Sequence, residues 1–223
     1  MPAPALTLVI ANKNYSSWSM RPWVLLHARG IPFEEHMLKF DSQAWSEQIG
    51  GLSPTGLVPV LWEGEPGKGF ATWDTLAIAE RLHELFPGHG IWPGDARPRA
   101  QARSAAAEMH SGFRALRGAM PMNIRGSYPG KGMNADVAKD ISRIGTLWAA
   151  AREPFLFGEF CAADAFYAPV ATRLATYAVE LAGRARDYHR ALLASPAVQA
   201  WSAGARKETE FCAADEPYAP ALR

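Results

Sequence analysis

One interruption divides this chain of 223 residues into two unlike parts. The segment from Pro87 to Gly94 holds three glycines and two prolines, a cluster that marks a linker. Before it, short apolar runs rich in strand-forming residues alternate with helical patterns. After it, the sequence is rich in alanine and predicts only helices. We therefore predict an α/β domain over residues 1–86, a linker over 87–96 and an all-α helical bundle over 97–223.

The first part predicts a small layered domain. Apolar runs typical of strands cover residues 6–11, 33–40, 58–62 and 70–72. Helical periodicity predicts a helix from Met20 to a stop at Gly30, a short helix at 45–49 and a third helix at 75–85. The order is strand, helix, strand, then a loop or helix, then two strands and a helix.

The second part predicts helices near 97–125, 135–153, 163–182, 184–194 and 197–208. It also contains a short repeat, because the segment from Phe160 to Pro169 nearly recurs from Phe211 to Pro220. The second copy has Pro217 where the first continues its helical pattern, so the two copies cannot share one fold throughout. The sequence gives no physical reason for the second copy.

Composition excludes several classes of function. A formal net charge of +1 provides no broad field that would recruit nucleic acid or an anionic membrane, and no apolar run approaches the length of a membrane span. Two cysteines are too few for a disulfide framework, and the six histidines form no ligand cluster, so we expect no metal. The first residues lack the pattern of a signal peptide, and we expect a cytoplasmic protein.

A proline inside an apolar strand is the most informative local feature. Pro59 cannot donate a hydrogen bond within a sheet, and a cis Val58–Pro59 bond would explain its place. Val58 would then offer its N–H and C=O to an extended peptide, as a neighbouring strand does. Thr75, at the start of the next predicted helix, is positioned to accept a carboxylate on free N–H groups and its hydroxyl. This combination indicates a small acidic thiol peptide as the ligand.

These segments resemble the cytosolic glutathione transferase family over nearly the whole chain. The resemblance lies in Leu57 to Leu61 as a cis-proline segment, in Asp74 followed by Thr75, and in Phe160 to Asp164 as a capped helix start. The stretch from Tyr15 to Arg21 is similar to the serine motif of the zeta class, the maleylacetoacetate isomerase-like class, and Met109 to Asn123 is similar to bacterial members near that class. The resemblance implies a thioredoxin-like first domain, glutathione as co-substrate and a homodimer.

The resemblance also assigns roles to residues. Ser17 lies four residues before Arg21, as the catalytic serine does in theta-like and delta-like relatives, and it is the first candidate to stabilise the thiolate. Ser16 is the second candidate and Ser19 the third. In the peptide site, Val58 beside Pro59 would pair with the cysteinyl backbone, Thr75 would bind the γ-glutamyl carboxylate, Asp74 its ammonium, and Lys39 the glycyl carboxylate.

The second substrate would bind between the domains. We expect its pocket to be lined by Met109, Phe113 and Arg117, where apolar groups suit a hydrophobic electrophile and the arginine suits an acidic one. The predicted function is a glutathione S-transferase that activates the thiol as a thiolate. Three alternatives stay open: a glutathione-dependent cis–trans isomerase of the maleylacetoacetate type, a non-catalytic interaction module, and a thiol–disulfide oxidoreductase. The last is disfavoured because the first domain contains no cysteine.

Overall fold

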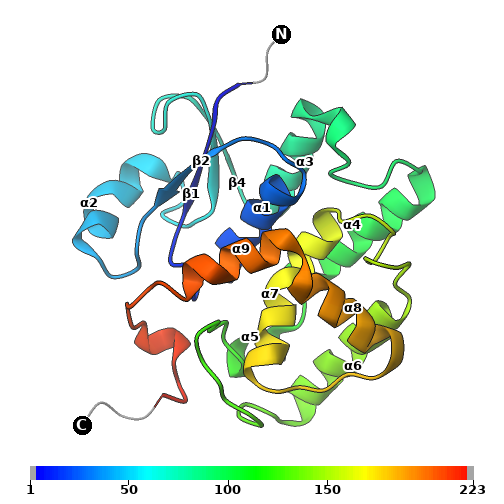
Figure 1. The fold of residues 1–223 in the computed structure, drawn as a ribbon. Coiled ribbons are helices and arrows are strands. Elements are labelled where there is room, and N and C mark those ends of the chain that lie inside the picture. The colour runs from blue at the N-terminus through cyan, green and yellow to red at the C-terminus, as the bar shows by residue number, and fades with distance from the viewer. Residues whose placement is uncertain (1–3, 220–223) are drawn as a thin grey trace.

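The computed structural model describes residues 4–219 and has an α/β part and a helical part (Figure 1). The first three residues of the predicted α/β domain and the last four of the predicted helical domain, including Pro220 of the repeat, lie outside the described residues. The first part contains a four-stranded sheet in the order β2-β1-β3-β4. Its strands are β1 (Leu6–Ile10), β2 (Glu34–Met37), β3 (Val60–Glu63) and β4 (Phe70–Trp73).

Strand β1 lies in the interior of the sheet, between β2 and β3. Every residue of β1 is buried, which explains why four of its five residues are apolar and the strand does not alternate apolar with polar residues. It pairs in parallel with β2 and antiparallel with β3, and β3 pairs antiparallel with β4. This arrangement, together with the helical second part, confirms the predicted fold class.

Helices cover both faces of the sheet (Figure 1). One face packs against α1 (Ser17–Ala28) and α3 (Thr75–Leu85), and the other packs against α2 (Gln43–Leu52). The observed elements differ from the predicted ones at their ends: α1 begins at Ser17, three residues before Met20, and α2 is longer than the predicted 45–49. Strand β3 begins at Val60, so Val58 and Pro59 lie just before the strand, and their peptide bond is cis.

The segment between the two parts is ordered and packed. It contains a short 3-10 helix, η1 (Pro87–His89), and the side chains of Ile91 and Trp92 are buried. Arg29, which directly follows α1, donates hydrogen bonds to the carbonyl oxygens of His89 and Phe160. The linker therefore joins the two parts through contacts with both.

The second part is built around one buried helix, α7 (Ala162–Thr176), which packs against both α1 and α4. Its other elements are α4 (Ala96–Ser111), α5 (Arg114–Ala119), α6 (Ala135–Ala149), α8 (Gly183–Ala194), α9 (Pro196–Ala205) and the 3-10 helix η2 (Ala213–Asp215). Helix α9 also packs against α1. None of the helices in residues 4–219 is long and apolar enough to cross a membrane.

The prediction of one helix over 97–125 is wrong. Helix α4 ends at Ser111, and Phe113 has a φ of +54°, a left-handed conformation that interrupts the helix before α5. A Cβ at Gly112 would lie 2.6 Å from the Glu108 carbonyl oxygen, so glycine permits this tight turn. The predicted helices 135–153, 163–182 and 197–208 also end earlier, at Ala149, Thr176 and Ala205.

Candidate active site

A cavity of about 860 Å³ lies between the two parts of the chain. The α/β part contributes the loop before α1, the start of α1, and side chains near α2 and β3. The helical part contributes the end of α4, α5 and one side chain of α7. The lining residues used below are Tyr15, Ser16, Ser17, Trp18, Val58, His110, Arg114, Arg117, Arg173 and Asp215.

Ser17 is the first residue of α1 and faces this cavity. Its hydroxyl oxygen accepts a hydrogen bond from Nη2 of Arg173 at 3.2 Å. That bond occupies a lone pair and leaves the hydroxyl hydrogen available for donation to another group. Because the first N–H groups of a helix also lack intrahelical partners, the start of α1 favours an anion beside Ser17.

The neighbouring residues Ser16 and Ser19 stabilise the turn that leads into α1. Ser16 is the N-cap of α1: its hydroxyl donates to the Ser19 hydroxyl at 2.7 Å and accepts from the Ser19 N–H at 3.4 Å. Ser19 is fully buried, accepts from the Ala11 N–H at 3.2 Å and does not line the cavity. The structure therefore places Ser16 and Ser17 together in the site and Ser19 beneath it.

Arg173 is fixed in place on α7. Its Nε donates to the Met120 carbonyl oxygen at 2.9 Å, and its Nη1 donates to the Pro169 carbonyl oxygen at 3.4 Å. Burial and the charge of Arg117 lower the pKa of Arg173 to about 10, so the guanidinium remains a cation at neutral pH. The sequence interpretation missed Arg173, although an arginine within an otherwise apolar helix is a signal of this kind of site.

Two further arginines stand close to this cation. Arg117 lies over the ring of Trp18, 4.9 Å from its centroid, and donates to the His110 carbonyl oxygen at 3.3 Å. Arg21 lies over the same ring at 3.8 Å, is fully buried, and has no hydrogen-bond partner for its guanidinium among the described residues. Burial, followed by the charges of Arg173 and Arg117, lowers the pKa of Arg21 well below its usual range. This end of the site is therefore strongly electropositive.

Val58 contributes a free segment of backbone to the cavity wall. Within residues 4–219 its N–H and C=O have no hydrogen-bond partner, since sheet pairing begins at Val60. The preceding residue, Leu57, is exposed and also lines the cavity, whereas Pro59 is buried. Val58 thus has the unpaired donor and acceptor that an extended peptide requires.

Asp74 and Thr75 form the start of α3 and adjoin the cavity through a histidine. Asp74, with a φ of +71°, caps α3 by accepting from the Leu76 N–H at 2.8 Å. Its other carboxylate oxygen lies 2.7 Å from Nε2 of His110, which lines the cavity. Thr75 is buried, and its hydroxyl has no hydrogen-bond partner within the described chain. The sequence interpretation assigned no role to His110 and missed this link.

Lys39 lies outside the cavity lining. Its ammonium group forms an ion pair with the carboxylate of Glu210, in the segment that follows α9. A role in binding a carboxylate of a ligand would require this pair to open.

Two of the predicted co-substrate residues lie outside the cavity lining. Met109 is fully buried, and Phe113 is nearly so and packs 6.4 Å from the ring of Tyr167. The left-handed φ of +54° at Phe113 ends the helical periodicity on which its placement relied, and Met109 lies on the buried side of α4. Arg117, the third residue of the group, does line the cavity. Residues 4–219 contain no group of three or more histidine, cysteine or acidic residues that could hold a metal ion.

Comparison with known proteins identifies the first part of the chain. Residues 15–85 match the N-terminal domain of the glutathione S-transferase family. A segment of 66 residues, 29% of this chain, is 36% identical to a dichloromethane dehalogenase of Methylorubrum extorquens. The match spans about a fifth (22%) of the length of that relative.

Solved structures resemble the whole fold. A glutathione transferase homologue from Burkholderia, with bound glutathione, has a TM-score of 0.70 at 23% identity and covers 92% of this chain and 100% of its own. A maleylacetoacetate isomerase from Anaeromyxobacter dehalogenans has a TM-score of 0.65 at 20% identity, covering 93% and 100%. At these identities the likeness shows the fold alone.

Proposed function

We propose that the chain is a glutathione S-transferase, since residues 15–85 match the N-terminal domain of that family, and that it binds glutathione in this cavity and activates its thiol for attack on a small electrophile. The observation that carries the proposal is the position of the Ser17 hydroxyl at the start of α1, bonded to Arg173 and facing the cavity. The Burkholderia homologue with bound glutathione supports the choice of ligand.

The proposed chemistry begins with ionisation of the thiol. A cysteine thiol has an ordinary pKa of about 8.5 and is mostly protonated at neutral pH. Donation from the Ser17 hydroxyl, the N-terminus of α1 and the charge of Arg173 all favour the anion, and the proton leaves to solvent. With an aryl or alkyl halide, the sulfur then forms a bond to the carbon, the carbon–halogen bond breaks and halide departs with its electron pair.

The backbone of glutathione is proposed to lie along Val58. Its cysteinyl N–H and C=O would pair with the free groups of that residue. The γ-glutamyl carboxylate would bind at the start of α3, where the Thr75 hydroxyl lacks a partner within the described chain. Asp74 would accept from the γ-glutamyl ammonium, and Lys39 would bind the glycyl carboxylate if its pair with Glu210 opens.

A second candidate function is cis–trans isomerisation of an acidic dienone, in which glutathione is returned. The observation that favours it is the group of arginines at one end of the cavity, Arg114, Arg117 and Arg173, which suits a carboxylate-bearing substrate. The thiolate would add to a conjugated carbon–carbon double bond and leave again after rotation about the resulting single bond.

We also propose a homodimer, as the family resemblance implies. The outer strand β4 leaves the side chains of Phe70 and Trp73 exposed by 61% and 46%, and exposed apolar side chains on an edge strand favour a protein contact. Sedimentation of wild type and of Phe70→Ser with Trp73→Ser tests this. A monomeric wild type would contradict it.

A panel of electrophiles tests the two enzymatic functions. It contains a chlorinated dinitrobenzene and a cis-dienone acid, each assayed for product and for glutathione loss. Product with stoichiometric loss of glutathione supports the transferase, and product without loss supports the isomerase. Glutathione binding without turnover of any member would instead support a non-catalytic module, and absence of glutathione binding would contradict both enzymatic functions.

A further inference from the structure

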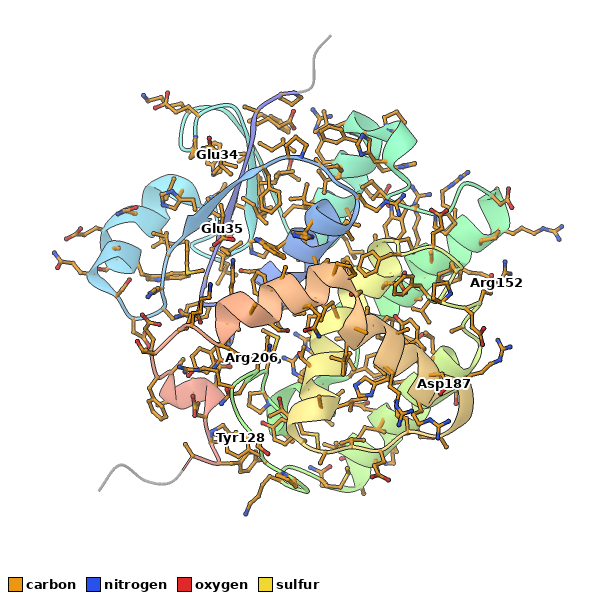
Figure 2. The ribbon with its side chains drawn as sticks, viewed as in Figure 1. Glu34, Glu35, Tyr128, Arg152, Asp187 and Arg206 are labelled. Carbon is orange, nitrogen blue, oxygen red and sulfur yellow. The ribbon has the colours of Figure 1, made fainter. Side chains whose placement is uncertain are left out.

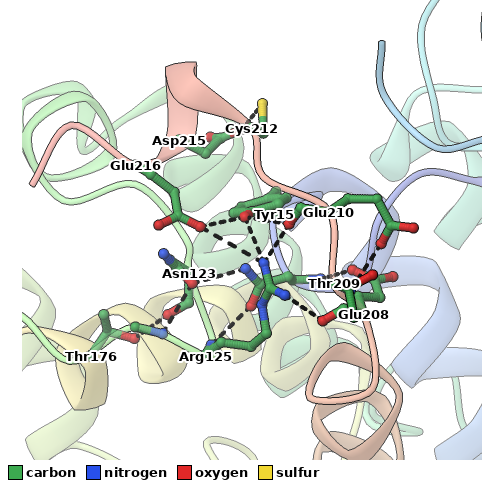
Figure 3. A network of polar contacts seen from close by, with 12 residues as sticks. Tyr15, Asn123, Arg125, Thr176, Glu208, Thr209, Glu210, Cys212, Asp215 and Glu216 are labelled. Atoms are coloured by element: carbon green, nitrogen blue, oxygen red, sulfur yellow. Dashed lines mark hydrogen bonds and ion pairs between the residues drawn. The ribbon is translucent and has the colours of Figure 1, made fainter. Parts of the chain in front are cut away.

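The segment that follows α9 runs beside the loop before α1 and is bonded to it (Figures 1 and 3), and it contributes Asp215 to the cavity lining. We name residues 208–219 the C-terminal strap. At its start, the carboxylate of Glu208 accepts from the backbone N–H groups of Lys13 at 2.7 Å and Asn14 at 3.0 Å. The strap is therefore joined directly to the loop that leads into Ser17.

A second attachment is made through Tyr15, which also lines the cavity. The Tyr15 hydroxyl donates to the carboxylate of Glu216 and accepts from Nη2 of Arg125 at 2.8 Å (Figure 3). Arg125 also donates to the Glu210 carbonyl oxygen at 2.5 Å. Burial, followed by the hydrogen bond to Glu216, raises the pKa of Tyr15, which keeps this hydroxyl protonated. These contacts hold both halves of the strap against the site.

The strap brings the second copy of the repeat into the cavity. Cys212 precedes η2, and its thiol donates to a carboxylate oxygen of Asp215 at 3.3 Å. Asp215 lines the same cavity as Arg114, Arg117 and Arg173 and is its one carboxylate among the described lining residues. Burial raises the pKa of the Asp215 carboxyl above its usual value, and the hydrogen bond from Cys212 and the charge of Arg173 oppose this rise in part.

We propose that Asp215 is a specificity-determining residue that disfavours acidic electrophiles at the arginine end of the cavity. A carboxylate-bearing electrophile that approaches Arg173 would also approach the negative charge of Asp215, and like charges within a partly desolvated site repel each other strongly. A neutral electrophile of the same shape meets no such repulsion. The inference deepens the proposed transferase function and rests on it.

The test compares 4-chloro-3,5-dinitrobenzoate with its neutral methyl ester. Both have the same leaving group and the same attacked carbon, and they differ in one negative charge and in the ester methyl group. Their difference in intrinsic reactivity cancels when the ratio is compared between protein variants. The ratio of kcat/KM for the acid to kcat/KM for the ester is measured at saturating glutathione in wild type and in Asp215→Asn. We expect the ratio to rise roughly tenfold in the variant, because one unit of negative charge is removed from a partly buried wall.

The ratio isolates the charge effect from any loosening of the strap, since a looser strap changes both substrates alike. The matched control is Asp187→Asn on α8, an exposed residue that lies away from the strap (Figure 2). In this control the ratio should stay at the wild-type value.

The possible outcomes distinguish failure of the inference about Asp215 from failure of the proposed transferase function. If wild type conjugates both compounds and Asp215→Asn leaves the ratio unchanged, the inference is overturned and the transferase function stands. If the ratio rises equally in Asp187→Asn, the inference is also overturned, because the effect belongs to the net charge of the protein. If wild type binds no glutathione, the proposed function fails, and the inference fails with it.

Discussion

The same five residue types, from Phe160 to Asp164 and from Phe211 to Asp215, occupy opposite environments in this protein. In the first copy, Cys161 is the buried N-cap of α7, and the fully buried Asp164 accepts from the backbone N–H groups of Leu156 at 3.0 Å and Cys161 at 2.8 Å. In the second copy, Asp215 ends a 3-10 turn and lines the cavity, and its carboxylate accepts a hydrogen bond from the thiol of Cys212.

The difference shows that a capping pattern does not by itself determine what its acidic residue does. The Asp164 carboxylate is surrounded by donors, including the Tyr188 hydroxyl at 3.0 Å, and it is committed to the fold. Pro217 excludes continuation of a helix after the second copy, so Asp215 stays at the surface of the site. One aspartate therefore serves stability, and the other is free to act on a ligand.

Removal of the two carboxyl groups gives the largest predicted contrast in stability. Asp164→Ala leaves two backbone N–H groups and a tyrosine hydroxyl without their buried acceptor, and we expect a loss of about 4 kcal/mol in the free energy of unfolding. Asp215→Ala should cost less than about 1 kcal/mol, because its carboxyl is partly solvated. Urea denaturation of both variants measures this, and equal losses would remove the contrast.

The pH dependence of stability should also differ between Asp164 of the first copy and Asp215 of the second. Burial raises the pKa of Asp164 to about 6, whereas the unfolded value is about 3.9. Folding thus favours the protonated form, and stability from this group is lost as pH rises through about 4 to 6. Relative to Asp164→Asn, wild type should lose about 2 kcal/mol between pH 4 and 7.

The same titration of Asp215→Asn against wild type provides the comparison. Its carboxyl is less buried, so the pH-dependent difference should be smaller than that for Asp164. A flat difference for Asp164→Asn across this range would show that the donors around it stabilise the anion fully.

Neighbouring serines offer a second contrast between fold and function. Ser17→Ala should lower kcat/KM roughly 100-fold, because it removes the donor proposed for the thiolate, and leave the melting temperature nearly unchanged. Ser16→Ala should cost about 1 kcal/mol of stability through loss of the N-cap. Steady-state kinetics with thermal melts checks both. Unchanged turnover in Ser17→Ala would move the role of thiol donor to Ser16.

Substitution of the two cysteines, one in each copy of the repeat, should change the free energy of unfolding least. Cys161→Ser supplies a better N-cap oxygen to α7, and we expect a gain of about 0.5 kcal/mol. Cys212→Ser should change stability by less, since η2 is only a short turn. Urea denaturation of both variants measures the change in the free energy of unfolding. A larger change for Cys212→Ser would contradict the view that the first copy of the repeat stabilises the fold more than the second.

Much of the fold could be predicted because local patterns agree with the tertiary structure. The apolar run at 6–11 is a buried strand, and α3 has the predicted bounds, Thr75–Leu85. The break after Ser111 could not be predicted in this way, since alanine-rich helical periodicity continues across Gly112 and the left-handed turn at Phe113 depends on packing.

The sequence predicted those residues of the candidate site that lie on a short segment with a recognisable pattern. Ser16, Ser17 and Val58 lie on short stretches with recognisable chemistry, and the structure places all three at the cavity. Arg173 and Asp215 are distant in sequence from Ser17 and reach the cavity only through the packing of α7 and the strap. Met109 was assigned from its helix alone, and the side of α4 that it occupies faces the core.

The pKa of the thiol of bound glutathione tests the central claim most directly. Ultraviolet absorbance of the thiolate is followed against pH at saturating glutathione, in wild type, Ser17→Ala and the control Ser16→Ala. Our account predicts a wild-type pKa clearly below the ordinary value of about 8.5, and a return toward that value in Ser17→Ala alone. An unshifted thiol in wild type, or an equal shift in Ser17→Ala, would contradict it.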